Sequence, residues 1–443
     1  MMLMIDDFNR PISPNVESYK QKPLDIFTTD DSIKSAAVQK PLVDVDKLED
    51  MMGVPEDPKQ PTVEATKTSK RLKLIAWWKQ RSKKQHMLLI VASLLVLGLG
   101  SGGLAYFVVH KNKPKANALA VTKVDTKKVP VVTTVASTLS GLPVEPIINA
   151  RPVIGVMIEN SPDARPQSGL DQASVVFEAI AEGGITRFLT LFQDTQPDYV
   201  GPVRSVRPYY EQWVLGFDAP IAHVGGSPEA LANIKAWGVK DLDQFYNSGS
   251  YRRVGSRAAP HNVYASVADL TNLAVSKGYS SSTFTGFERK AEKPYKAPVA
   301  SSTATAKDSR TPANVINLAI SGALYNVRYD YDAATNSYKR NLAGQPHMSM
   351  DAAGAQKQIT PKVVIALAMS YGIQSDGKHS VYGTIGSGQA FVFQDGTVTT
   401  GTWSKASSAE QFKFTDASGK PLTINPGQTW ITAVGAAGNV TYQ

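Results

Sequence analysis

The sequence predicts an α+β protein that is anchored to a membrane and has a mixed α/β domain followed by a smaller, mainly β domain. Three observations support this fold class. Residues 87–109 form an apolar stretch without a single charge. Short apolar runs alternate with helical patterns over residues 149–290, as they do in layered α/β domains. From residue 313 onwards, short alternating segments are separated by Gly-containing turns, which is typical of β-structure.

The apolar stretch at residues 87–109 is long enough to be a single transmembrane helix. At about 1.5 Å per residue, a helix of this length crosses a hydrocarbon layer of about 30 Å. Lys and Arg are more numerous before the stretch, in residues 70–86, than after it. Because cytoplasmic flanks hold the excess of positive charge, we expect a cytoplasmic N-terminus and extracellular C-terminal domains in a single-pass protein of the cell membrane. Residues 70–109 are expected to contact membrane lipid.

The rest of the chain divides by composition. Residues 1–69 are acidic and contain scattered prolines, which predicts a disordered cytoplasmic tail ahead of the basic juxtamembrane segment 70–86. Residues 110–148 are rich in Lys, Val, Thr and Pro and are interpreted as an extracellular stalk. The α/β domain is expected at 149–290, a linker at 291–312, and the mainly β domain at 313–443.

Within the first exterior domain, apolar runs predict strands at residues 153–158, 174–180 and 188–192. Helices are expected at 205–217 and 228–237. In the second domain, residues 327–340 are interpreted as a hairpin. Asp395-Gly396 is the strongest signal for a hairpin turn in the chain. Trp403 and Trp430 are expected in the core.

Composition excludes several classes of function. The chain has 443 residues, a net charge of +9 and no cysteine. The lack of cysteine rules out thiol catalysis, thiolate metal sites and a lipid-bearing cysteine, and it suits an exported protein of a bacterial envelope. No basic and aromatic module of the ribonucleoprotein type is present, so nucleic acid is not an expected partner. No cofactor and no metal site are predicted.

The densest polar cluster lies between residues 151 and 207, where several side chains directly follow apolar runs. Strand ends deliver such side chains to one edge of a sheet, where ligand clefts form. Guanidinium groups bind phosphate or carboxylate in a bidentate fork, so four arginines could form a shared anion site. These are Arg165, Arg187, Arg204 and Arg207. The alternative is that each arginine pairs with Glu159, Glu178 or Glu182 and braces a turn.

A second candidate element lies just before the helix expected at 228–237. His223 ends a short apolar run and is followed by Gly225, Gly226 and Ser227. Glycines at a turn from strand to helix let a ligand approach free backbone N–H groups at the positive helix end. Ordinary N-capping by Ser227 is the alternative explanation.

The sequence offers only weak candidates for catalysis. Glu178 or Glu182 could act as a general acid or base with assistance from His261. No spacing typical of a metal site and no Gly-x-Ser-x-Gly motif accompanies them. In the distal domain, Arg340, His347 and Asp351 are expected to form surface pairs rather than to line a groove.

Several ordered motifs of the chain resemble the YerB-like lipoprotein family. The distal domain carries matching segments as well. The motifs lie at residues 151–161, 164–170, 182–187, 201–205, 260–262, 386–390, 401–405 and 426–431. The resemblance implies a two-domain exported protein held at the outer face of a bacterial membrane, in a family of unknown function. This chain differs from the lipoprotein members because it lacks the anchoring cysteine and has the apolar stretch 87–109 instead.

Three functions remain open at this point. In the first, the arginine-rich cleft binds an anionic component of the cell envelope, either a wall polymer or a peptidoglycan fragment. In the second, the same cleft is an envelope glycan hydrolase or transferase that uses a Glu/His acid–base pair. In the third, the protein is a scaffold at the cell surface that recruits protein partners through its distal β domain.

Overall fold

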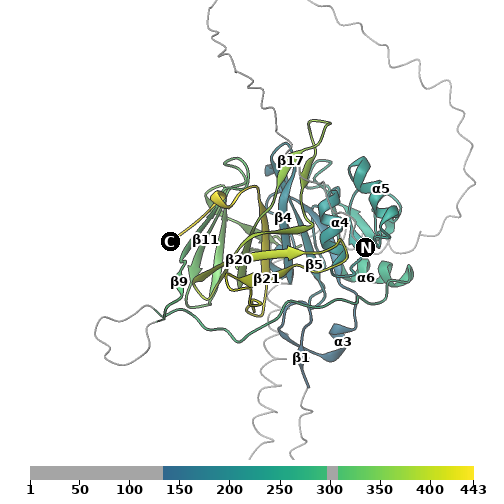
Figure 1. Ribbon diagram of the computed structural model, residues 1–443. Coiled ribbons are helices and arrows are strands. Elements are labelled where there is room, and N and C mark those ends of the chain that lie inside the picture. The colour runs from purple at the N-terminus through teal and green to yellow at the C-terminus, as the bar shows by residue number, and fades with distance from the viewer. Residues whose placement is uncertain (1–132, 297–307) are drawn as a thin grey trace, which may run out of the picture. The chain divides into compact units, whose positions relative to one another are not determined.

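The computed structural model describes residues 133–296 and 308–443 (Figure 1). These residues belong to one compact unit, Val124–Gln443. The predicted tail, the juxtamembrane segment and the apolar stretch 87–109 lie outside the described residues, and so does most of the predicted stalk. Among the residues that are described, no helix is long and apolar enough to cross a membrane. The transmembrane helix therefore stays a prediction.

A ten-stranded sheet forms the centre of the described part. Its strand order is β21-β20-β19-β16-β22-β4-β5-β3-β6, and the short β9 (Thr311–Pro312) pairs with β20 at one side. The strand bounds are β3 Ile154–Glu159, β4 Val175–Glu182, β5 Ile185–Phe192, β6 Ile221–Ala222, β16 Val363–Ala368, β19 Gly386–Gln394, β20 Thr397–Lys405, β21 Lys413–Asp416 and β22 Thr429–Val434.

This sheet crosses the boundary between the two predicted exterior domains. β22 pairs in parallel with β4, in a register that places Trp430 beside Val176 and Thr432 beside Glu178. β22 also pairs in parallel with β16 on its other side. Strands from the two ends of the described chain therefore share one hydrogen-bonded sheet, and the residues of the two segments contact each other directly.

The two faces of the central sheet are covered differently. Successive side chains of a strand point to opposite faces. On β4, Phe177 stacks against Trp213 of helix α4 (Pro208–Leu215), with ring centroids 5.3 Å apart. The next residue, Glu178, contacts Arg340 of a second sheet on the other face. Coverage on both faces explains why β3 is buried along its whole length and reads as a continuous apolar run.

The second sheet has five antiparallel strands in the order β13-β12-β11-β10-β23. Their bounds are β10 Val315–Leu318, β11 Val327–Asp332, β12 Ser337–Leu342, β13 Gln345–Pro346 and β23 Val440–Tyr442. Four small two-stranded ladders complete the β-structure of the described residues. They are β1 Val135–Ala136 with β2 Pro143–Val144, β7 Tyr251–Arg253 with β8 Val263–Ala265, β14 Met348–Met350 with β15 Gln356–Gln358, and β17 Tyr371–Ile373 with β18 Ser380–Tyr382.

Besides α4, the α-helices within residues 133–296 and 308–443 are α3 (Pro146–Asn149), α5 (Pro228–Ala236) and α6 (Val267–Ser276). The helix predicted at 228–237 is confirmed as α5. Ser227 is its N-cap and accepts a hydrogen bond from the N–H of Ala230 at 3.3 Å. Gly238, with φ of 66°, follows the helix in the left-handed conformation that ends many helices.

The predicted strands at 153–158, 174–180 and 188–192 are confirmed as β3, β4 and β5. The hairpin predicted at 327–340 is confirmed as β11 and β12. Asp395 and Gly396 join β19 to β20 with φ of 59° and 72°, which fits a two-residue turn of type I′. Trp403 and Trp430 are buried as expected. Strands greatly outnumber helices in the described residues.

Candidate functional site

The predicted polar residues lie mainly at one edge of the central sheet, where β3 and β4 end and β5 begins. Glu159 is the last residue of β3, and Glu182 is the last residue of β4. Glu159 is the register partner of Arg187 across the antiparallel pair of β3 and β5. Directly opposed residues of such a pair place their side chains on the same face. The sheet itself therefore brings two glutamates and one arginine to a common edge.

The Glu182 carboxylate forms ion pairs with two of the four predicted arginines. Arg187 contacts Glu182 Oε1 at 2.6 Å, and Arg207 pairs with Oε2 of the same carboxylate. Both guanidinium groups are almost fully buried, whereas the Glu182 side chain is 33 % exposed. Burial tends to raise the pKa of Glu182, but the two arginines outweigh it and hold the pKa below its ordinary value. Glu182 is therefore a carboxylate at neutral pH.

Arg204 lies beside a second carboxylate, that of Glu159. We call Arg187, Arg204 and Arg207, together with Glu159 and Glu182, the arginine row. Arg204 Nε is 3.2 Å from Glu159 Oε2. The same Glu159 oxygen accepts a hydrogen bond from His261 Nδ1 at 2.9 Å, and Ser161 Oγ donates to the other oxygen at 2.9 Å. Since Nδ1 donates, Nε2 of a neutral His261 ring is a free acceptor, and it lies 4.0 Å from the exposed Asp163 carboxylate.

Two of the predicted arginines keep one donor without a partner. Within the described residues, the Nε–H groups of Arg187 and Arg207 are buried and donate no hydrogen bond. Arg204 Nε is also buried and makes no well-aligned hydrogen bond, but it forms the ion pair with Glu159 at 3.2 Å. Arg187 and Arg207 do use their terminal nitrogens on backbone oxygens, those of Ser205 and Val206 respectively. Buried donors are rarely left unpaired, so the Nε atoms of Arg187 and Arg207 indicate that an acceptor can be added here.

Arg165 is not part of this row. Its guanidinium donates to Asn160 Oδ1 at 3.1 Å and to the backbone oxygens of Asn160 and Leu324 at 2.9 Å. It also lies over the Tyr325 ring, 5.2 Å from the centroid. Arg165 thus joins a loop that follows β3 to the segment before β11, and the prediction that all four arginines share one hollow is not what the structure shows.

Glu178 lies in a fully buried network. Both of its oxygens accept hydrogen bonds from Arg340 at 3.0 Å, and Oε2 also accepts one from Trp430 Nε1 at 3.0 Å. Arg340 in turn donates to His347 Nδ1 at 2.9 Å. Glu178 and Arg340 are completely inaccessible to solvent. This placement argues against Glu178 as an acid or base for a dissolved substrate.

The surface pairing expected for Arg340 and His347 is wrong. Both side chains are buried because they bridge the central sheet and the second sheet, which the sequence pattern did not reveal. Burial, with the nearby Arg340 and Arg165, lowers the pKa of His347 well below its ordinary value. The imidazole is therefore neutral and serves as a hydrogen-bonding link in the network, in which Nε2 contacts Gln167 Oε1 at 2.9 Å.

Two of the three backbone donors of the Gly225–Ser227 turn already have partners. The N–H of Gly225 donates to Asp243 Oδ1 at 3.0 Å, and the N–H of Ser227 donates to the backbone oxygen of Val206 at 3.4 Å. His223 is buried between the Gly225 carbonyl oxygen at 2.9 Å and Asp241 Oδ1 at 3.0 Å. These contacts hold the turn against its neighbours, so its geometry supports a structural role for His223, Gly225 and Gly226.

The family of the chain follows from comparison with known proteins. Residues 139–280 match the N-terminal domain of a family described as "Protein of unknown function (DUF3048)", and residues 316–431 match the C-terminal domain of that family. The chain is 32 % identical over 298 residues to "Putative lipoprotein YerB" of Bacillus subtilis (strain 168). The aligned region covers 67 % of this chain and 85 % of that relative. The chain belongs to the YerB-like family. The resemblance seen in its motifs is thereby confirmed.

The fold of this YerB-like chain is also similar to a solved structure. The crystal structure of YerB protein from Bacillus subtilis superposes with a TM-score of 0.60 at 28 % identity, and the match covers 70 % of this chain and 99 % of that one. The family is described as of unknown function, so the role of the site has to be argued from its geometry.

In this YerB-like chain, sequence reasoning missed the role of Glu159 as the partner of His261. The two residues are 102 positions apart and meet only when the loop after β7 folds against the end of β3. No local spacing signals such a contact. Over residues 133–296 and 308–443, no group of three or more His, Cys, Asp or Glu side chains is arranged to hold a metal ion.

Proposed function

We propose that the protein is a membrane-held surface protein of the cell envelope that binds an anionic group of an envelope component. The relative from Bacillus subtilis is named as a lipoprotein, which supports a surface location. This chain has no cysteine to carry a lipid, so the predicted span at residues 87–109 would take over the anchoring role. The ligand class we propose is a wall polymer or a peptidoglycan fragment that carries phosphate or carboxylate.

The observation that carries this proposal is the pair of buried Nε–H donors, on Arg187 and Arg207, that have no acceptor among the described residues. The arginine row holds three arginines against two glutamates, Glu159 and Glu182. Guanidinium groups that are already desolvated and held in place lose little side-chain entropy when they bind an oxyanion. An anionic ligand would supply the missing acceptors.

Glu182 is the group that a ligand would replace. It is 33 % exposed, while the two arginines it holds are 3–4 % exposed. A phosphate or carboxylate of the ligand can therefore displace the Glu182 side chain towards solvent and take its place between Arg187 and Arg207. Arg204 is 21 % exposed and stands three positions before Arg207 in the sequence, so we expect the same ligand to reach it.

The test is binding of the full chain to purified phosphate-bearing wall polymer, measured at several salt concentrations. We expect the affinity to fall as salt rises, because exposed charges are screened over about 10 Å at 0.1 M salt. Arg204→Ala is expected to weaken binding about tenfold or more, since a hydrogen bond to a charged group contributes roughly 1.5–3 kcal/mol. Arg328→Ala removes an exposed arginine that pairs with Asp330, and it should leave affinity unchanged. Salt-insensitive binding, or equal loss in both variants, contradicts the proposal.

A second candidate function is acid–base catalysis at His261, and the 2.9 Å contact with Glu159 favours it. A carboxylate at Nδ1 fixes the ring orientation and leaves Nε2 to take a proton from water or a hydroxyl group. Glu159, and not Glu178 or Glu182, is the carboxylate that does this. If the full chain cleaves labelled wall polymer, we expect His261→Gln to abolish cleavage while binding persists. Absence of cleavage by the unmodified chain rejects this candidate.

A further inference from the structure

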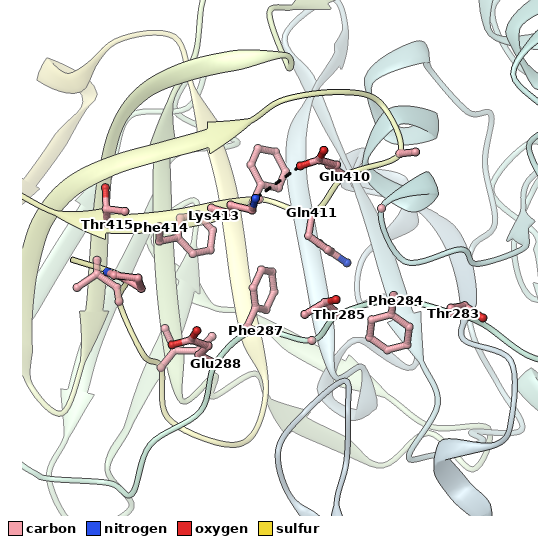
Figure 2. A pocket seen from close by; sticks show the side chains of 17 residues that line it. Thr283, Phe284, Thr285, Phe287, Glu288, Glu410, Gln411, Lys413, Phe414 and Thr415 are labelled. Atoms are coloured by element: carbon pink, nitrogen blue, oxygen red, sulfur yellow. Dashed lines mark ion pairs between the residues drawn. The ribbon is translucent and has the colours of Figure 1, made fainter. Parts of the chain in front are cut away.

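We propose that a cavity lined by none of the residues of the arginine row binds an extended peptide with apolar side chains and a basic residue. The cavity has a volume of about 750 Å³ and lies between residues 283–288 and residues 409–415. Figure 2 shows these two stretches along opposite sides of it. Ligand sites commonly measure about 300–1,000 Å³. None of the predicted site residues lines the cavity, so this inference is independent of the proposed function.

Aromatic side chains from both stretches give the cavity an apolar surface. Phe287 lies against Phe414, with ring centroids 5.6 Å apart, and Phe414 stacks on Phe412 at 6.3 Å. Phe284 packs on the buried Phe217, with ring centroids 5.7 Å apart. Phe284 and Phe287 are themselves only partly buried, so they are accessible to apolar side chains of a ligand.

The backbones along the cavity have hydrogen-bonding capacity that the described residues do not use. The N–H and C=O groups of Thr285, Phe287 and Gln411 form no hydrogen bond with another described residue. At one end the stretch is tied down, because Ile424 donates to the Glu288 carbonyl oxygen at 2.9 Å. An extended peptide that lies between two extended backbones can pair its own N–H and C=O groups with theirs, as in β-strand addition.

The side chain of Gln411 gives a second, independent indication of an amide ligand. Its Oε1 and Nε2 atoms are both shielded from solvent and have no hydrogen-bond partner in the described part of the chain. Figure 2 shows the side chain extending from its own stretch towards Thr285 and Phe284 on the other side. An unpaired buried amide is unfavourable. A peptide unit supplies the acceptor and the donor that this amide lacks.

Charge at the cavity selects the kind of peptide. Lys413 is 3.7 Å from Glu410 and is paired with it. Glu288 also lines the cavity and is exposed. The lining therefore holds two carboxylates and one ammonium group. The exposed carboxylate of Glu288 favours a ligand with a basic residue. In this respect the cavity is the opposite of the arginine row.

The experiment presents the full chain with a positional-scanning library of hexapeptides that are acetylated and amidated at their ends. We expect it to retain pools that combine alternating apolar residues with Lys or Arg. The affinity of the tightest peptide is then measured by fluorescence anisotropy. Gln411→Leu should weaken it about tenfold, because one donor and one acceptor are lost. The melting temperature should not fall, since the amide has no hydrogen-bond partner among the residues that the structure describes. Gln172→Leu, at an exposed glutamine elsewhere, is the matched control.

Glu288→Lys provides a second variant whose result does not depend on Gln411. It should reverse the preference of the retained pools from basic to acidic residues. The proposal is overturned if no pool is retained, if Gln411→Leu binds the peptide as tightly as the unmodified chain, or if methylation of the peptide's backbone nitrogens leaves binding intact. It is equally overturned if Arg204→Ala abolishes retention while Gln411→Leu does not, because the peptide then binds at the arginine row.

Discussion

Replacement of Arg340 by Met is expected to lower the free energy of unfolding by about 3–5 kcal/mol, since it leaves a buried charge without its partner. Arg340 is completely buried and donates to both oxygens of Glu178 at 3.0 Å. Its guanidinium also lies over the Trp430 ring, 4.3 Å from the centroid. The three residues come from β12, β4 and β22, so this contact joins the two segments that match the family's separate domains.

Denaturation by urea, followed by tryptophan fluorescence, measures this effect. Arg328→Met is the matched control on the neighbouring strand β11, where the arginine is half exposed and pairs with Asp330. Exposed pairs contribute about 0–1 kcal/mol, so the control should stay close to the unmodified chain. A double replacement of Glu178 by Leu and Arg340 by Met should recover much of the loss, because no unpaired charge remains. A loss below about 1 kcal/mol in Arg340→Met would contradict the account of this network.

The second large effect is a dependence of stability on pH that arises from Glu211 on α4. Both of its carboxylate oxygens are buried and have no partner in the described residues. Burial, together with the nearby Glu229 and Asp241, raises the pKa of Glu211 to about 9, although Asn233 opposes the shift. The folded state therefore favours the protonated form. This contribution to stability is present at pH values below the ordinary pKa of a glutamate and is lost as pH rises towards 9.

We expect the free energy of unfolding to fall by about 1.4 kcal/mol per pH unit between pH 5 and 8 through this residue. Glu211→Gln should remove this slope, so that the variant is more stable than the unmodified chain at pH 8 and similar to it at pH 5. Denaturant titrations at pH 5, 6, 7 and 8 provide the measurement. Glu145→Gln, at an exposed glutamate, should change nothing. Equal pH slopes for the unmodified chain and Glu211→Gln would show that Glu211 is ionised in the folded state.

Local patterns predicted the local structure well. The apolar runs that became β3, β4 and β5 could be recognised because strands buried on both faces lack polar residues. The turn at Asp395 and Gly396 could be predicted because a type I′ turn needs positive φ at both positions. The cap at Ser227 was predictable for the same kind of reason, since capping depends on residues three positions apart.

Contacts between distant segments could not be predicted in this way. β22 joins β4 although more than 250 residues separate Trp430 from Val176 in the sequence, and no short pattern encodes that register. Arg340 was expected at the surface because arginine is rarely buried without a partner, and its partner Glu178 lies 162 positions earlier. The N–H of Gly225 was expected to be free, but Asp243 accepts its hydrogen bond from a loop 18 residues later.

Among the four predicted arginines, the sequence correctly predicted some positions and failed for one. Arg187 and Arg207 converge because their strand and loop end at the same sheet edge, as strand-end reasoning predicts. Arg165 diverges because its loop turns towards Leu324 and Tyr325, which belong to the other matched segment. The number of arginines in the site therefore depended on how the two segments pack, and composition alone does not determine that.

The anion-binding proposal is tested most directly by NMR of the arginine Nε–H groups in the full chain during titration with phosphate-bearing wall polymer. The account predicts that the Nε resonances of Arg187, Arg204 and Arg207 shift together and saturate. The ligand supplies the acceptor that Arg187 and Arg207 lack among the described residues, and at Arg204 it competes with Glu159, which lies 3.2 Å from Nε. Arg165, whose Nε already donates to Asn160, should not move. Resonances of the three arginines that stay fixed while polymer binds, or that move no more than that of the exposed Arg328, would contradict it.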